Sequence, residues 1–214
     1  MLKFQILTNS VQYKFISIEG NIGAGKTSLV ELLSKHFGCN ALFEEFENNP
    51  FLPNFYKDIK SHALAVELFF LAERYRQLTT ITNQKLVADY YFPKSKIFAS
   101  FNLQKEEMEL FNTFYEVIEQ KIILPEIVLF IDRDNNFLRK NILSRGRGYE
   151  KLISADYLNR VRNGYFEFFK NENRMPILII NSGESNFYES NALEAFIDKV
   201  FTKKWANGVQ TIDL

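Results

Sequence analysis

The sequence contains a single cysteine, no excess of either charge and no long apolar run. Cys39 is the only cysteine among 214 residues, which rules out an internal disulfide and a cysteine-rich zinc site. Lysine plus arginine and aspartate plus glutamate number 26 each, so the formal net charge is zero. A general binder of nucleic acid or of membrane surfaces carries a basic excess, and we therefore expect neither partner.

No stretch has the length and apolarity of a signal peptide or a membrane span, which favours a cytoplasmic protein. Instead, 46% of the residues are hydrophobic and 22 are phenylalanine, enough for a large core. We find no repeat, low-complexity tract or linker. The sequence therefore predicts a single domain over residues 1–214.

Short apolar runs recur along the chain without alternating polar residues, a pattern typical of strands buried on both faces of a parallel sheet. They comprise residues 15–18, 41–43, 86–88, 127–131 and 177–180. Helical periodicity is found between and after them, over residues 29–36, 111–118, 135–144 and 193–200. Strands that alternate with helices predict βαβ units and an α/β fold with a parallel sheet.

A glycine-rich loop follows the first predicted strand. Residues 20–27 read Gly-Asn-Ile-Gly-Ala-Gly-Lys-Thr, which satisfies the P-loop pattern G-x-x-x-x-G-K-[ST], and a predicted helix follows. The glycines let backbone N–H groups point at phosphate oxygens, and the helix adds the positive end of its dipole. We expect a nucleoside triphosphate to bind Gly20, Asn21, Ile22, Gly23, Ala24, Gly25, Lys26, Thr27 and Ser28. Lys26 would reach the terminal phosphates and Thr27 would bind Mg²⁺.

Acidic residues follow three of the other predicted strands. Asp89 and Asp132 are alternative candidates for a Walker-B acid, and no N-K-x-D motif for reading guanine in a GTPase is present. Glu44 and Glu45 follow the second strand, at the edge where ligands bind in an open parallel sheet. A carboxylate there is either a general base for a substrate hydroxyl or a solvated loop acid.

Glu67 lies in a predicted helix that is apolar nearly all round, so its carboxylate needs a partner. Glu67 and Arg74 share one helical stripe, which places them in a common pocket or in a structural ion pair. Arg145 and Arg147 lie on a loop flanked by glycines, after the predicted helix 135–144. Such a loop is either a solvated turn or a lid over a transferring phosphoryl group, and the P-loop favours the lid.

Over roughly residues 14–203 the sequence resembles the deoxynucleoside kinase family. Ile-Glu-Gly-Asn-Ile-Gly-Ala-Gly-Lys-Thr at residues 18–27 is close to the P-loop of that family and more specific than the general pattern. The segments Asn49-Pro50-Phe51 and Phe55-Tyr56 resemble bacterial members, and Lys96-Ile97-Phe98-Ala99 resembles the family's Arg-Tyr-Ile-Phe-Ala. The resemblance implies a P-loop NTPase fold with a five-stranded sheet, an arginine-bearing lid and a homodimer, with the helix around residues 111–118 as a candidate interface.

The resemblance also implies roles for single residues. Glu44 matches the general base, Tyr56 and Glu150 match the pair that holds the sugar 3′-hydroxyl, and Arg74 matches the arginine that reads the base. Lys26, Arg145 and Arg147 match residues that act on the transferring phosphate, and Asp89 with Thr27 would hold Mg²⁺. Residues 181–187 resemble the loop around the adenine of the donor.

Two positions depart from the family pattern. Tyr90 stands where the Asp-Arg-Ser motif has its arginine, which implies altered activity or another cation in its place. Glu67 stands where the family has a glutamine that reads the base. An ionised glutamate only accepts hydrogen bonds, and guanine presents two donors, N1–H and the N2 amine. We therefore expect a purine preference, with guanine slightly favoured over adenine.

Together these features predict a kinase that transfers the γ-phosphate of ATP, or of another triphosphate, to the 5′-hydroxyl of a deoxyribonucleoside. It would serve nucleotide salvage. The alternatives are another P-loop phosphotransferase, such as a nucleoside monophosphate kinase, and a protein that binds nucleotide without catalysis. The first would accept monophosphates, whereas the second would bind ATP and turn over no deoxynucleoside.

Overall fold

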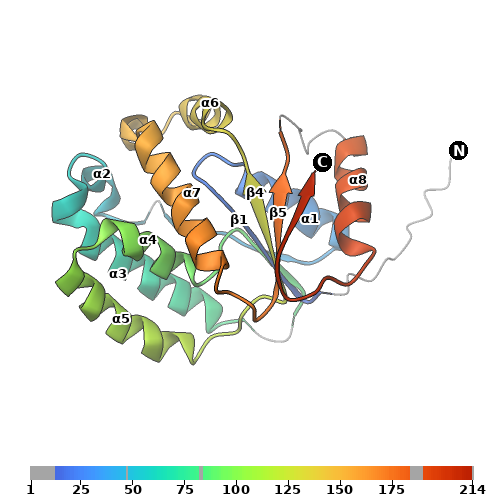
Figure 1. The fold of residues 1–214 in the computed structure, drawn as a ribbon, viewed down its shortest axis with the longest axis horizontal. Coiled ribbons are helices and arrows are strands. Elements are labelled where there is room, and N and C mark those ends of the chain that lie inside the picture. The colour runs from blue at the N-terminus through green and yellow to red at the C-terminus, as the bar shows by residue number, and fades with distance from the viewer. Residues whose placement is uncertain (1–12, 47, 82–83, 184–189, 214) are drawn as a thin grey trace, which may run out of the picture.

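A computed structural model describes residues 13–46, 48–81, 84–183 and 190–213. Its centre is one parallel sheet with the strand order β2-β3-β1-β4-β5-β6, in which every neighbouring pair is parallel (Figure 1). The strands are β1 (Phe15–Gly20), β2 (Asn40–Leu42), β3 (Leu86–Ala88), β4 (Ile127–Asp132), β5 (Pro176–Asn181) and β6 (Gly208–Asp213). The predicted α/β class and the five predicted strands are confirmed to within about two residues at their ends.

The strand number implied by the resemblance, five, is wrong, because β6 adds a sixth strand. It pairs with β5 in the register Ile177 to Val209 through Asn181 to Asp213. Its sequence, Gly-Val-Gln-Thr-Ile-Asp, contains no continuous apolar run, and most of its residues keep solvent contact at the sheet edge. A search for strands buried on both faces therefore passes over it.

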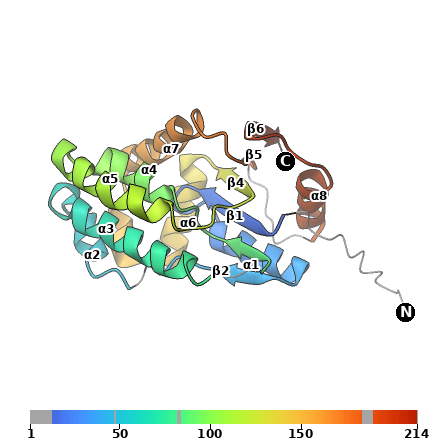
Figure 2. The same cartoon turned by 90° about the horizontal axis from the view of Figure 1, so that it is seen from below.

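Helices connect and cover the strands (Figures 1 and 2). They are α1 (Lys26–Phe37), α2 (Leu52–Phe55), α3 (Ile59–Leu78), α4 (Lys94–Asn102), α5 (Lys105–Glu119), α6 (Asn135–Arg145), α7 (Ala155–Phe169) and α8 (Ser190–Phe201), with a 3-10 turn, η1, at Gly148–Leu152. Each predicted helical segment lies within one of them. None of the helices in the described ranges is long and apolar enough to cross a membrane.

Local capping sets where several helices begin. The Asp58 side chain accepts a hydrogen bond from the Ser61 N–H at the start of α3, and Ser154 caps α7 in the same way. Asp134 accepts two backbone hydrogen bonds at the start of α6. These caps satisfy backbone donors that have no partner within the helix, and so they fix the residue at which each helix begins.

The sheet lies between two helical layers. Helices α1 and α8 share one face, where the rings of Phe37 and Phe201 meet edge to face. Helix α7 covers the other face, where Tyr165 packs on Phe130 of β4, and α3, α4 and α5 pack beside it (Figure 2). All six residues of β1 are buried, which makes it a central strand of the core. Because β1 and β2 both pair in parallel with β3, the segments that follow these three strands meet at one edge of the sheet.

Candidate active site

The glycine loop leaves β1 and turns directly into α1. Gly20, Gly23 and Gly25 all have positive φ angles, of 150°, 84° and 92°. A Cβ at Gly20 would lie 2.8 Å from the Ile131 carbonyl oxygen, and one at Gly23 would lie 2.6 Å from that of Leu138. Glycine is therefore required here by close backbone approach as well as by conformation. The loop is also bound to α6, because the Asn141 side chain donates to the Gly23 carbonyl oxygen at 2.8 Å.

Lys26 and Thr27 form the first turn of α1 and face the end of β3. The Lys26 ammonium donates to the carbonyl oxygens of Gly20 and Asn21, at 3.0 Å each. Burial, followed by the positive charge of Lys94, lowers the pKa of Lys26 to about 8. The Thr27 hydroxyl donates to Asp89 Oδ2 at 2.9 Å. The structure therefore places the two predicted Mg²⁺ ligands, Thr27 and Asp89, in direct contact.

Of the two candidate Walker-B acids, only Asp89 lies beside the P-loop. Asp89 Oδ1 accepts a hydrogen bond from the Glu44 N–H at 2.7 Å, which ties the ends of β2 and β3 together. Asp132 instead forms a bidentate pair with Arg162, at 2.8 and 2.6 Å. The fold therefore identifies Asp89, and not Asp132, as the candidate Walker-B acid beside the P-loop.

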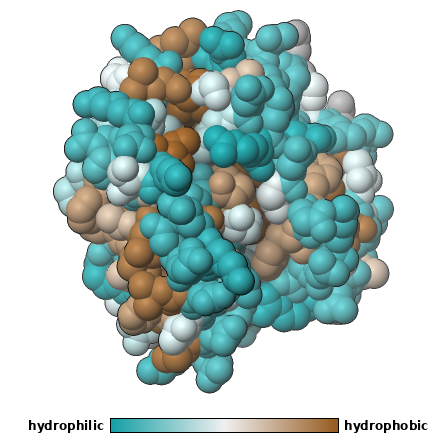
Figure 3. Space-filling model, turned by 60° about the vertical axis from the view of Figure 1, so that its left-hand side comes forward, coloured by the Kyte–Doolittle hydropathy of each residue, from teal (hydrophilic) through white to brown (hydrophobic). Residues whose placement is uncertain are grey.

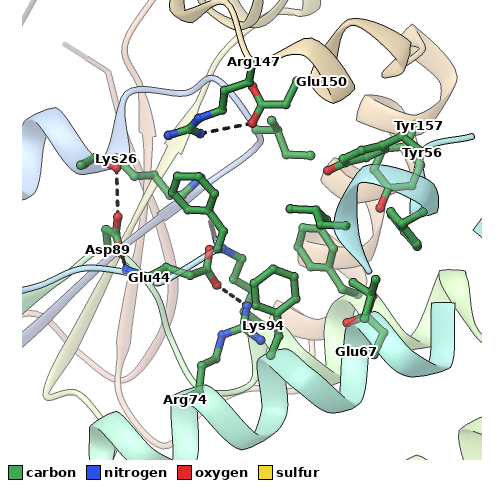
Figure 4. A pocket seen from close by; sticks show the side chains of 18 of the residues that line it. Lys26, Glu44, Tyr56, Glu67, Arg74, Asp89, Lys94, Arg147, Glu150 and Tyr157 are labelled. Atoms are coloured by element: carbon green, nitrogen blue, oxygen red, sulfur yellow. Dashed lines mark hydrogen bonds and ion pairs between the residues drawn. The ribbon is translucent and has the colours of Figure 1, made fainter. Parts of the chain in front are cut away.

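Glu44 points inward and is bound by two cations from different helices. Arg74 of α3 donates to Glu44 Oε1, and the Lys94 ammonium at the start of α4 donates to Oε2 at 2.6 Å (Figure 4). Burial raises the pKa of the Glu44 carboxyl, but Lys94 and Arg74 outweigh burial and lower it to about 2. Glu44 is therefore an anion at neutral pH, directed at the cavity.

The neighbour of Glu44 points the opposite way. Glu45 is exposed and pairs at the surface with Arg76 at 3.0 Å and with the Gln77 amide at 3.1 Å. Tyr90 is also turned away from the cavity, because its hydroxyl donates to Gln77 Oε1 at 2.7 Å in a buried position. Position 90, where the family pattern has an arginine, therefore holds a buried tyrosine of the core.

These residues surround a cavity of about 770 Å³ that is partly open to solvent. It reaches from Lys26 and Asp89 at the P-loop to Glu67, Tyr56 and Tyr157 on the other side (Figure 4). Apolar side chains supply much of its wall, as is typical of small-molecule sites. The apolar members are Ile22, Phe46, Leu52, Phe55, Val66, Phe70 and Phe98.

Glu67 lies at the far side of the cavity and is 2% exposed. Its Oε1 accepts a hydrogen bond from the Asn102 amide at 2.8 Å. Among the described residues, Glu67 and Arg74 form no ion pair with each other, because Arg74 is committed to Glu44 and to Ser95 Oγ at 2.6 Å. Burial raises the pKa of Glu67 to about 7. The shared pocket predicted for these residues is confirmed, and the alternative of a mutual ion pair is wrong.

The predicted lid residues meet above the cavity. Arg145 ends α6, and its Nε lies 2.9 Å from Glu150 Oε2 in η1. Arg147 approaches the other oxygen of Glu150 at 3.3 Å, and its guanidinium lies 3.8 Å from the ring centroid of Phe46. Tyr56 stacks parallel to Tyr149 of the same turn. All four predicted residues of this group therefore line the cavity.

The structure adds residues that the sequence did not single out. Lys94, Asn102 and Tyr157 all contact predicted site residues from α4 and α7. Lys94 could have been found from its spacing, because it lies four residues before Phe98 and therefore on the same face of the helix. No local pattern points to Asn102 or Tyr157. The predicted donor loop, residues 181–187, lies outside the described residues from position 184 onward.

Comparison with known proteins adds to this geometry. The family model described as deoxynucleoside kinase matches residues 16–205. The chain belongs to the deoxynucleoside kinase family. It is 36% identical to a deoxyguanosine kinase of Bacillus subtilis over 157 residues, which cover 71% of this chain and 76% of that protein. It is 29% identical to a deoxyguanosine kinase of Lactobacillus johnsonii, over 82% of this chain and 85% of that protein.

A solved structure shows the same fold. Deoxyadenosine kinase from M. mycoides with bound dATP superposes with a TM-score of 0.72 at 23% sequence identity. The match covers 87% of this chain and 98% of that one. The P-loop NTPase fold predicted for this member of the deoxynucleoside kinase family is therefore confirmed.

Proposed function

We propose that this deoxynucleoside kinase transfers the γ-phosphate of ATP to the 5′-hydroxyl of a purine deoxyribonucleoside, with deoxyguanosine favoured over deoxyadenosine. Family membership supports the reaction class. The observation that carries the assignment is the placement of Glu44, an inward-facing carboxylate beside the P-loop in a cavity of about 770 Å³. The names of the relatives, deoxyguanosine and deoxyadenosine kinases, support the purine preference.

The donor is assigned to the P-loop. Helix α1 begins at the loop with Gly25 as its N-cap, and the positive end of its dipole favours an anion there. Lys26 at present binds two carbonyl oxygens of the same loop, and we propose that these bonds are exchanged for phosphate oxygens when ATP binds. A triphosphate would then extend toward Asp89 and Glu44.

Mg²⁺ fits the residues at this point. The hydroxyl of Thr27 and the carboxylate of Asp89 are adjacent oxygen ligands, the kind that a hard cation prefers. We propose that both hold the ion, directly or through water. When bound, Mg²⁺ neutralises part of the phosphate charge.

The acceptor is assigned to the cavity between Glu44 and Glu67. We propose that Tyr56 and Glu150 hold the sugar 3′-hydroxyl and that Glu67 binds the base, with Arg74 beside it. Glu44 accepts the proton of the 5′-hydroxyl as the O–H bond breaks, and the 5′-oxygen forms a bond to the γ-phosphorus. The bond from the γ-phosphorus to the bridging oxygen breaks, and ADP leaves. Arg145 and Arg147 offset the negative charge that develops on the transferring group.

The preference for guanine rests on the carboxylate of Glu67. The Asn102 amide donates a hydrogen bond to Glu67 Oε1, which fixes the orientation of the Glu67 carboxylate. Ionised Glu67 would accept from guanine N1–H and N2 amine, whereas its protonated form would offer one donor and one acceptor, as adenine requires. The raised pKa of Glu67, about 7, places both forms near neutral pH, which agrees with only a slight lean toward guanine.

One observation bears on the alternative of a nucleoside monophosphate kinase. Such an enzyme needs cations free to bind the phosphate of its acceptor. Arg74 and Lys94, the two buried cations on the acceptor side, are both paired with Glu44. This arrangement favours an acceptor with a hydroxyl group over one with a phosphate.

A transfer assay with radiolabelled ATP and Mg²⁺ tests the proposal. The panel contains the four deoxynucleosides and their monophosphates. We expect label on deoxyguanosine and deoxyadenosine, with little on the pyrimidines. A marked pyrimidine preference would refute the assignment of the base, label on monophosphates would favour the alternative kinase, and ATP binding without transfer would identify a non-catalytic protein.

We further propose a homodimer, a cytoplasmic location, a role in nucleotide salvage and a single domain over residues 1–214. One stripe of α5 supports the dimer, because Leu110, Phe114 and Val117 are 47%, 49% and 55% exposed at i, i+4, i+7 spacing. The face turned forward in Figure 3 carries hydrophobic groups between polar ones. One sheet that contains the first and last described strands supports the single domain.

A further inference from the structure

Lys94 is a buried lysine to which no role is yet assigned. It is 6% exposed, and Glu44 is its only ion-pair partner among the described residues. Its ammonium lies 2.6 Å from Glu44 Oε2 and 5.7 Å from the ring centroid of Phe98. Burial of an ammonium is costly unless a partner compensates for the lost water, so the position of Lys94 depends on this carboxylate.

Helix α4 does not itself favour a cation at this position. Lys94 is the first residue of α4, where the positive end of the helix dipole lies and where acidic side chains are preferred. Ser95, the next residue, binds Arg74 at 2.6 Å, so the start of α4 supplies both a cation for Glu44 and a support for the second cation. The two helices thereby grip the same carboxylate from two sides.

The grip leaves Glu44 able to act. An ionised carboxylate has about four acceptor positions on its two oxygens, and Arg74 and Lys94 occupy one on each. A substrate hydroxyl can therefore bind Glu44 without displacing either cation. Lys94 and Lys26 line the same cavity, Lys94 on the Oε2 side of Glu44 and Lys26 at the P-loop.

From this geometry, and resting on the proposed kinase function, we propose that Lys94 is a positioning residue of the phosphoryl transfer. It fixes the Glu44 carboxylate toward the P-loop and places a positive charge beside the site of the attacking 5′-oxygen. No proton passes through Lys94. The core residue Tyr90 supplies no cation at the end of β3, so Lys94 provides the second charge from four residues further along the chain.

The test compares Lys94→Met and Lys94→Gln with Lys94→Arg, and uses Lys96→Met as the matched control. Lys96 lies two residues along the same helix, but its ammonium faces the ring of Tyr115 at 5.1 Å instead of the cavity. Steady-state kinetics with deoxyguanosine and Mg·ATP give kcat and KM for both substrates. Circular dichroism and thermal unfolding show which variants fold, and Lys94→Gln replaces Lys94→Met if the latter does not.

We expect the neutral variants to lose about 10²-fold in kcat, with the KM for ATP changed less than about 3-fold, because a displaced base impairs the chemical step more than donor binding. Lys94→Arg should recover most of kcat, and Lys96→Met should match wild type.

The proposal is overturned if the neutral variants keep wild-type kcat. It is also overturned if Lys94→Arg loses kcat as severely as the neutral variants, or if the neutral variants raise the KM for ATP as much as they lower kcat, since either pattern identifies a structural ion pair alone. If wild-type protein phosphorylates no deoxynucleoside, the proposed function itself fails, and this result is distinct from both.

Discussion

At the scale of single residues, the site is defined by which carboxylates are paired and which are not. Glu44 is held as an anion by Arg74 and Lys94, with a pKa of about 2, whereas buried Glu67 accepts a hydrogen bond from the Asn102 amide and has a pKa of about 7. Two glutamates that line one cavity therefore have opposite properties. Near neutral pH, Glu44 is an anion, as a proton acceptor must be, whereas Glu67 exchanges between its neutral and anionic forms.

Glu44→Gln should lower kcat by about 10²–10⁴-fold, because the amide cannot take the 5′-hydroxyl proton. ATP binding, measured by calorimetry, should change little, since no P-loop residue is altered. Glu45→Gln is the matched control, because Glu45 is exposed and its carboxylate contacts Arg76, Gln77 and Asn48 outside the cavity. A severe loss in Glu45→Gln together with a mild one in Glu44→Gln would show that the general base is misassigned.

Glu67→Gln should stabilise the ligand-free protein relative to wild type as the pH rises. The folded protein holds the Glu67 proton to about pH 7, whereas the unfolded chain releases it near 4.5. Wild type therefore loses stability across this window and the variant does not, by up to about 3 kcal/mol in the free energy of unfolding. Urea unfolding of both proteins at several pH values measures the difference. A difference that stays constant from about pH 4.5 to 7 would contradict the raised pKa.

At the scale of elements, the sequence correctly predicted the features that depend on residues close together in the chain. The P-loop was found because its glycines, lysine and threonine are close together in the sequence and lie directly before a helix. Strands β1, β3, β4 and β5 were found because burial on both faces leaves continuous apolar runs. Strand β6 was missed because its side chains alternate at an exposed edge. The partners of Glu44 could not be predicted, because Arg74 and Lys94 reach it only through the packing of α3 and α4.

Two glycines, one in the P-loop and one at the end of α6, separate the cost of close backbone approach from the cost of a positive φ angle. Gly23→Ala places a Cβ 2.6 Å from the backbone oxygen of Leu138, so the loop must move away from α6. Gly146→Ala, at the end of α6, meets nothing within 4 Å and is strained only by its φ of 72°. We expect a loss of about 1 kcal/mol for Gly146→Ala and of more than about 2 kcal/mol for Gly23→Ala.

Equilibrium unfolding in urea gives both values, and ATP binding should weaken only in Gly23→Ala. Equal losses of stability in the two variants would show that close approach to α6 does not constrain the P-loop.

At the scale of the whole molecule, the sheet gathers the site at one edge and leaves α5 on the outside of the helical layer. The buried side of α5 holds Phe111 and Tyr115, which pack with Phe92, while its outer side carries the stripe of Leu110, Phe114 and Val117. The proposed homodimer would cover this stripe without closing the cavity, because no residue of α5 lines it.

Phe114→Glu should convert a wild-type dimer to a monomer, since it places a charge in the centre of the apolar stripe. Analytical ultracentrifugation measures the mass in solution. Leu143→Glu serves as the control, because Leu143 is 60% exposed on α6, away from α5, and should leave the dimer intact. A wild-type protein that stays monomeric, or a Phe114→Glu variant that stays dimeric, would contradict this interface.

The central claim is that Glu44 faces the 5′-oxygen of a nucleoside whose other side is held near Glu67. A crystal structure with deoxyguanosine and a non-hydrolysable ATP analogue tests it most directly. We predict that the 5′-oxygen lies about 3 Å from a carboxylate oxygen of Glu44, between that group and the terminal phosphate on the P-loop. A nucleoside bound elsewhere, or one whose 5′-oxygen points away from Glu44, would contradict the account.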